Sequence, residues 1–84
     1  MHNKYHIRYY EFDPTTSKYH PTNIQCARSF TLSNAVKALN KIQRALTLTN
    51  LMLSRSVPNR LDVYIAAENN KKYLCAFYVI EEDK

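Results

Sequence analysis

Three basic side chains, Lys37, Lys41 and Arg44, follow one another at spacings of four and three residues. Helical periodicity places residues with this spacing on one face of a helix. No Asp or Glu occurs within residues 14–60, so no acidic residue near in sequence neutralises the three charges. Lys and Arg side chains neutralise phosphates and release counterions, so this basic stripe predicts a surface that binds nucleic acid or an acidic protein surface.

Other basic residues of the same region are candidates for the flanks of this surface. Their plain structural alternative is a solvated face, because a helix that covers a sheet exposes its outer side, where Lys and Arg are ordinary. The residues predicted to contact nucleic acid or an acidic partner are Lys37, Lys41, Arg44, Arg28, Arg55 and Arg60.

A second candidate surface is aromatic. In the strand register proposed below, Tyr64, Tyr73 and Phe77 lie on the sheet face that a single helix leaves open. Exposed rings on an open sheet stack on splayed RNA bases, and they are equally typical of protein interfaces, including those of homodimers. The structural alternative is that the strands curl and the rings fill a second small core.

Catalytic chemistry has little support. The seven acidic residues show no spacing that pairs them with a nucleophile. The chain contains no glycine, which rules out a Gly-rich phosphate loop, a dinucleotide fingerprint and a nucleophile elbow. We therefore expect a protein that is not an enzyme and that uses no cofactor.

Metal ligands and cysteines are sparse. His2 and His6 have a ligand-like spacing, and His6 approaches His20 if the first two strands pair, but no cysteine pair accompanies them. We therefore expect no metal site. Cys26 and Cys75 each lie in an apolar, strand-like stretch and are expected to be buried free thiols, with a single disulfide between them as the alternative.

Composition sets the class of protein. The 84 residues, with 45% apolar side chains, predict one small folded domain with a thin core. No apolar run approaches a membrane span and no secretory signal opens the chain, so a cytoplasmic location without membrane contact is expected. The net charge is +5, with a basic middle and the acidic residues 81–83 near the end. Whether this tail neutralises the stripe stays open.

The helix that carries the stripe is the strongest structural prediction. Thr31 or Ser33 can cap its first turn. Its other end falls near Asn50 or about Leu53, and Pro58 stops any continuation. The apolar residues that recur at helical spacing, opposite the stripe, are Leu32, Ala35, Val36, Leu39, Ile42 and Leu46.

Strands are predicted on both sides of this helix. Stretches that alternate or are rich in aromatic and β-branched residues are typical of strands, and proline-rich polar stretches are typical of loops. The predicted strands are residues 5–13, 23–30, 60–67 and 71–80, with a loop at 14–22.

The last two strands are predicted to form a hairpin. Asn69 and Asn70 suit a two-residue type I′ turn, which needs positive φ at both central positions. This turn sets a register with Val63 opposite Ala76, Ile65 opposite Leu74, Tyr64 opposite Cys75 and Ala66 opposite Tyr73.

The element order is therefore ββαββ. We expect a two-layer α+β domain in which an antiparallel sheet of about four strands is covered on one face by one amphipathic helix. The expected function is non-catalytic binding to nucleic acid or a nucleic-acid-handling complex through the basic helix face. The alternative is a protein-binding regulator or inhibitor, for example a phage or mobile-element accessory protein that blocks a host or defence enzyme.

Overall fold

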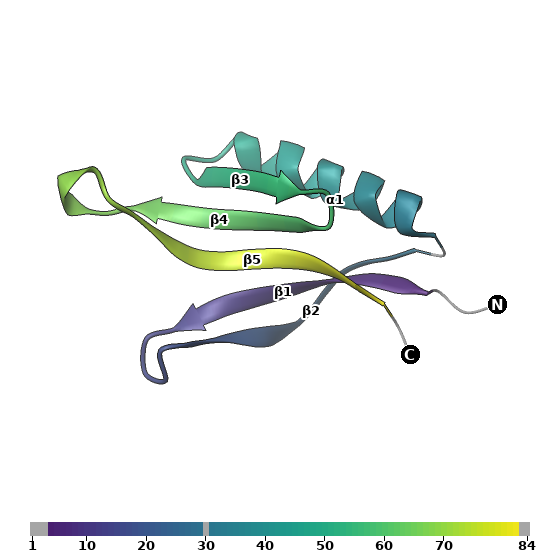
Figure 1. Cartoon of the computed structure of the whole chain (residues 1–84), viewed down its shortest axis with the longest axis horizontal. Helices are drawn as coiled ribbons and strands as arrows, with labels where there is room; N and C mark the ends of the chain where they lie inside the picture. The colour runs from purple at the N-terminus through teal and green to yellow at the C-terminus, as the bar shows by residue number, and fades with distance from the viewer. Residues whose placement is uncertain (1–3, 30, 83–84) are drawn as a thin grey trace.

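One helix packs on one face of an antiparallel sheet (Figure 1). The structure is a computed structural model that describes residues 4–29 and 31–82, with the backbone alone for 23–26. The sheet has the strand order β2-β1-β5-β4-β3. The elements are β1 (Tyr5–Asp13), β2 (Lys18–Ser29), α1 (Leu32–Thr47), β3 (Met52–Val57), β4 (Arg60–Ala66), the 3₁₀ turn η1 (Glu68–Asn70) and β5 (Lys72–Glu82).

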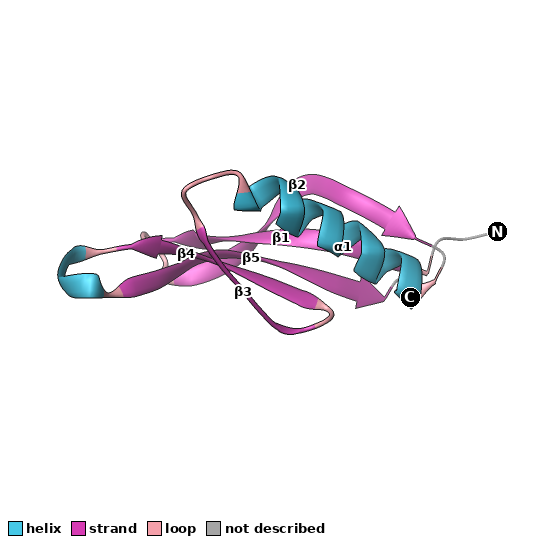
Figure 2. Cartoon of the chain, turned by 90° about the horizontal axis from the view of Figure 1, so that it is seen from above, coloured by secondary structure: helices cyan, strands magenta, loops and turns pink. Residues whose placement is uncertain are grey.

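The hydrophobic core lies between α1 and the sheet. Figure 2 shows α1 lying along one side of the sheet. Ala35 and Leu39 of α1 are almost completely buried against Ile7, Leu61 and Ile80 of the three central strands. The predicted two-layer α+β architecture with one covering helix is therefore confirmed. In the described part of the chain, no helix has the length and apolar character that a membrane crossing requires.

The expected number of about four strands is wrong, because β3 adds a fifth strand at the edge of the sheet. The apolar run after the helix suggested a longer helix, but from Met52 onward it alternates. Leu53 pairs with Val63 of β4 and packs beside the core, and Arg55 follows two residues later on the same side. The strand was not predicted because this charged residue interrupts the apolar alternation on the covered side.

Polar side chains define both ends of α1. Thr31 is the N-cap, as predicted, and its hydroxyl accepts a hydrogen bond from the Asn34 amide at 3.1 Å. At the other end, the Thr47 hydroxyl donates to the Arg44 carbonyl at 2.6 Å, and Thr49 donates to the Leu46 carbonyl at 2.6 Å. These bonds satisfy carbonyls that a helix end leaves free, so α1 ends at Thr47, earlier than either predicted end.

The second strand begins earlier than predicted, because β2 already starts at Lys18 inside the expected loop. Its Pro21 is tolerated because β2 is an edge strand and its missing amide faces no neighbour. The turn before it uses Ser17 with φ 57°, whose amide donates to the Asp13 carbonyl at 2.8 Å. The predicted strand residue Phe30 lies outside the described residues.

The β4–β5 turn has the predicted backbone, with φ of 64° at Asn69 and 60° at Asn70. The register is only partly as predicted. Val63 lies opposite Ala76 as expected, but Cys75 is an extra residue in β5. The register beyond this bulge shifts by one residue, so Tyr64 lies opposite Leu74, Ile65 opposite Tyr73 and Ala66 opposite Lys72. The shift leaves residues 68–70 as the connection between the two strands. On either side of it, the Ala67 amide donates to the Lys71 carbonyl at 2.8 Å.

The left-handed backbone at Asn70 leads to a stability prediction. A Cβ without a local hydrogen-bonding group is disfavoured there, so we expect Asn70→Ala to lower the free energy of unfolding by about 1 kcal/mol. Asn70→Gly should keep or raise it, because glycine adopts positive φ freely. Urea denaturation followed by circular dichroism measures both. Asn59→Ala, in a turn without positive φ, is the control. Equal stability of Asn70→Ala and wild type would contradict the prediction.

Candidate functional site

The basic stripe lies on the outer face of α1. Lys37, Lys41 and Arg44 are all exposed there, on the side away from Leu39. Among the residues that the structure describes, no carboxylate comes within 4.0 Å of any of the three. The three charges therefore face solvent, unpaired with any carboxylate of the described residues.

The remaining predicted basic residues do not join this stripe. Arg28 is exposed on the edge strand β2, opposite His6 of β1. Arg60 lies on the sheet face without the helix, where its Nε donates to Asp62 at 2.7 Å. The six predicted cations are thus distributed over several surfaces, and three of them share the outer face of α1.

Arg55 has a structural role. Its guanidinium donates to Asn40 Oδ1 at 2.9 Å and to Gln43 Oε1 at 2.8 Å, both on α1. It also donates to the carbonyls of Val57, at 3.3 Å, and of Pro58. Partial burial lowers the pKa of this guanidinium from its usual value. Arg55 therefore ties α1 to the β3–β4 turn, and most of its donors already make hydrogen bonds within the fold.

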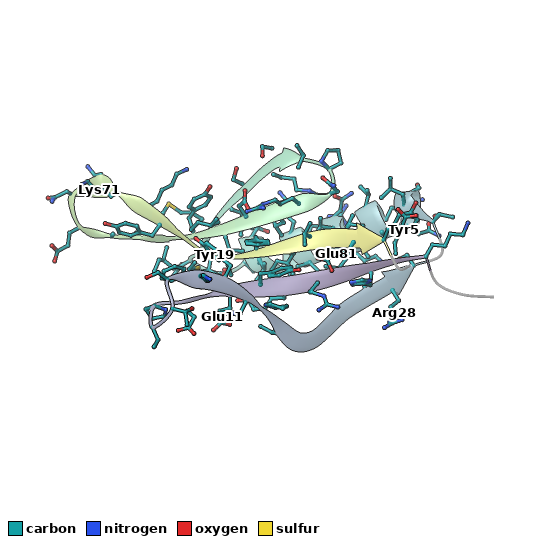
Figure 3. All side chains as sticks on the ribbon, turned by 60° about the horizontal axis from the view of Figure 1, so that its bottom comes forward. Tyr5, Glu11, Tyr19, Arg28, Lys71 and Glu81 are labelled. Carbon is teal, nitrogen blue, oxygen red and sulfur yellow. The ribbon has the colours of Figure 1, made fainter. Side chains whose placement is uncertain are left out.

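The sheet face without the helix carries a row of aromatic rings. The Tyr10 and Phe77 rings stack with centroids 4.8 Å apart, and the Arg60 guanidinium lies 4.0 Å from the centroid of Phe77. The row continues from Phe77 to Tyr19 at 5.4 Å and from Tyr19 to Phe12 at 5.2 Å. Figure 3 turns this face toward the viewer, with Tyr19 labelled. We call these rings, Tyr10, Phe12, Tyr19 and Phe77, the aromatic row.

The predicted aromatic surface is only partly present. Phe77 is central, but Tyr10 and Arg60 from the two neighbouring strands cover its ring. The Tyr64 ring lies under Lys72, whose Nζ is 4.7 Å from the centroid. Because Tyr73 lies opposite Ile65, next along β4 from Tyr64, the grouping of Tyr73 with Tyr64 and Phe77 on one face is wrong.

Most residues of the aromatic row were not among the predicted site residues. The signal was present in β1, where His6, Arg8, Tyr10 and Phe12 occupy alternate positions around the buried Ile7. Period-two alternation places these four side chains together on the face opposite Ile7. The pairing of β1 with β5, which brings Tyr10 to Phe77, has no local signal in the sequence.

An apolar cleft opens where the two hairpins separate. Strand β5 pairs with β1 only as far as Ala76, and beyond it the tips of the β1–β2 and β4–β5 hairpins diverge (Figure 1). The cleft between them has a volume of about 370 Å³, and the Tyr19 hydroxyl donates to the Leu74 carbonyl at 2.7 Å beside it. It is lined by Phe12, Tyr19, Ile65, Tyr73, Leu74 and Cys75.

Glu81 organises the other end of the open face. Its carboxylate accepts hydrogen bonds from the Tyr10 hydroxyl at 2.6 Å and His6 Nε2 at 3.0 Å, and lies 3.1 Å from Arg8 Nε. Partial burial alone would raise the pKa of Glu81, but the two hydrogen bonds and the Arg8 charge outweigh it and lower that pKa. Glu81 therefore neutralises charges on the open face, away from the basic stripe.

The histidine and cysteine side chains that the structure describes lie apart from one another. His6 and His20 do not meet, although β1 and β2 do pair, because His20 lies opposite Glu11, about 16 Å along β1 from His6. Over the described residues, no three His, Cys, Asp or Glu side chains gather as metal ligands. Cys75 is a free, half-buried thiol that donates to the Val63 carbonyl at 3.4 Å, and burial raises its pKa.

Comparison of the chain with known protein families, with curated proteins and with solved structures finds no match. The candidate surfaces are therefore the basic stripe, the aromatic row and the apolar cleft, each defined by this chain's own residues.

The lowered pKa of Glu81 leads to a pH prediction. A carboxyl whose pKa is lower in the folded state stabilises the fold above its ordinary pKa of 4.5, and this stabilisation is lost as the pH falls through the lowered pKa. We expect the free energy of unfolding of wild type to fall between neutral pH and about pH 3, and to fall less in Glu81→Gln.

Urea denaturation at several pH values measures this dependence. Glu68→Gln, in the exposed turn η1, is the control and should keep the wild-type dependence on pH. If wild type and Glu81→Gln lose stability in parallel as the pH falls, Glu81 is not responsible for the acid sensitivity.

Proposed function

We propose that this chain is a non-catalytic binding protein that docks through the outer face of α1 onto an anionic partner, nucleic acid or a nucleic-acid-handling complex. One observation carries the proposal: Lys37, Lys41 and Arg44 share an exposed face, and no carboxylate of the described residues lies near them. By contrast, Glu81 and Asp62 are paired on the opposite side of the sheet. The three charges of the stripe therefore lie where a partner can reach them.

The size of the stripe limits the expected affinity. Neutralising three phosphates of a duplex gives a slope of about −2 to −3 in log K against log salt. Such binding is appreciable at low salt and weak at physiological salt, so additional contacts are needed for a tight complex. The stripe also attracts an anionic partner before contact and raises the rate of association.

Reversing two of the charges tests the proposal. We expect Lys37→Glu/Lys41→Glu to weaken binding to oligothymidylate and to oligoglutamate by about tenfold at low salt, equivalent to about 1.4 kcal/mol. The same variant should have a shallower salt dependence than wild type, because fewer counterions are released. Fluorescence anisotropy titrations from low to physiological salt measure both quantities.

The matched control changes the net charge equally at a distance from α1. Lys18→Glu/Lys71→Glu alters two exposed lysines near the hairpin turns and should keep most of the binding. If both double variants lose affinity equally, the overall charge of the protein drives binding and α1 is not the site.

A second candidate function is regulation or inhibition by protein–protein contact at the apolar cleft. Phe12, Ile65 and Tyr73, on its walls, are 38%, 47% and 57% exposed. Exposed apolar side chains gathered around one cleft mark interaction sites more often than isolated ones do. A partner protein or a second copy of this chain could bury them.

Tyr73→Ser tests this candidate. We expect immobilised wild type to retain a partner protein, or to self-associate in sedimentation at micromolar concentration, and Tyr73→Ser to lose that interaction because an exposed ring is removed. Lys37→Glu/Lys41→Glu should retain it. Undiminished retention by Tyr73→Ser, with an unchanged circular dichroism spectrum, would contradict a role for the cleft.

A further inference from the structure

The basic stripe ends on a leucine. Leu48 follows the last residue of α1 and is 89% exposed, more than the other large apolar side chains in the described part of the chain. Its backbone is still helical, with φ −80° and ψ −4°. The Leu48 side chain is not part of the core. Its burial against a partner would therefore remove additional apolar area from water.

Leu48 lies on the same line as the three charges. At about 100° per residue, Lys37, Lys41, Arg44 and Leu48 fall within an arc of about 60°. Along the helix axis they span about 16 Å. The outer face of α1 therefore offers three cations followed by one apolar side chain, in a length that a single partner surface can cover.

The position of Leu48 is held by the helix end. The Thr47 and Thr49 hydroxyls on either side donate to carbonyls of the last turn, Arg44 O and Leu46 O, each at 2.6 Å. Leu46 packs beside the core, and Leu48, about 200° further round the helix, cannot also turn inward. The leucine is thus presented outward in advance, which reduces the ordering that binding requires.

We propose that the partner of α1 is an acidic protein surface with an apolar pocket that receives Leu48. This inference rests on the proposed function and narrows its partner class. Carboxylates around a groove complement the charges of Lys37, Lys41 and Arg44, and an apolar pocket complements Leu48, as in the docking of an amphipathic helix. A phosphate backbone complements the cations alone and leaves the leucine against charged groups.

The substitution Leu48→Lys distinguishes the two partner classes by the sign of its effect. It adds a fourth cation to the stripe and removes the apolar side chain. The probes are oligoglutamate, a peptide of equal length and charge with leucines interspersed, and oligothymidylate. We expect wild type to bind the leucine-containing peptide about tenfold more tightly than oligoglutamate.

Leu48→Lys should lose this preference while binding oligoglutamate more tightly than wild type does. Asn34→Lys is the matched control, because it adds the same charge to an exposed position of α1 and keeps Leu48. This control should strengthen binding to both peptides and keep the preference between them. Leu48→Asn, which adds no charge, should lose the preference as well and serves if Leu48→Lys does not fold.

Two failures are separable. If wild type binds both peptides equally, or if oligothymidylate is the tightest probe and Leu48→Lys tightens it further, the partner class is wrong although the stripe still binds. If Lys37→Glu/Lys41→Glu leaves every probe unaffected, or if wild type binds no probe at low salt, the proposed function fails together with the inference.

Discussion

The structure depends on one constraint: among the described residues, a single helix covers a five-stranded sheet, and it covers only one face. Ala35 and Leu39 bury that face against Ile7 and Leu61, and little apolar area remains to stabilise the rest. The outer side of α1 is consequently free for charge. The other sheet face must stabilise itself, which it does through ring contacts such as Tyr10 with Phe77 and through ion pairs.

Sequence patterns predicted the features that depend on interactions between residues near one another in the chain. The apolar periodicity of α1, the Thr31 cap and the positive φ at Asn69 and Asn70 each depend on a few neighbouring residues, and the structure has all of them. Exposure of the basic stripe follows from the same periodicity, because Lys37 lies opposite the apolar arc. What the stripe binds stays a prediction.

The remaining features depend on contacts between residues that lie far apart in sequence. The Tyr10–Glu81 hydrogen bond joins residues 71 positions apart, and no local pattern contains the β1–β5 pairing behind it. Arg55 was predicted to be a surface cation because its acceptors, the side-chain amides of Asn40 and Gln43, lie on α1 and not near it in sequence. Tyr73 lies on the opposite sheet face from the one predicted. The extra residue at the Cys75 bulge exchanges the two sides of the strand beyond it.

The segregation of charge across the sheet has a consequence for the molecule in solution. Pairs such as Arg60 with Asp62 largely cancel on one side, whereas on the other side no described carboxylate pairs with Lys37, Lys41 or Arg44. These charges therefore form an electric dipole across the sheet, with its positive end at α1. The field of a negatively charged body exerts a torque on this dipole that turns α1 toward the source during diffusion. Orientation is thereby selected before any side chain touches a partner, and added salt weakens that selection.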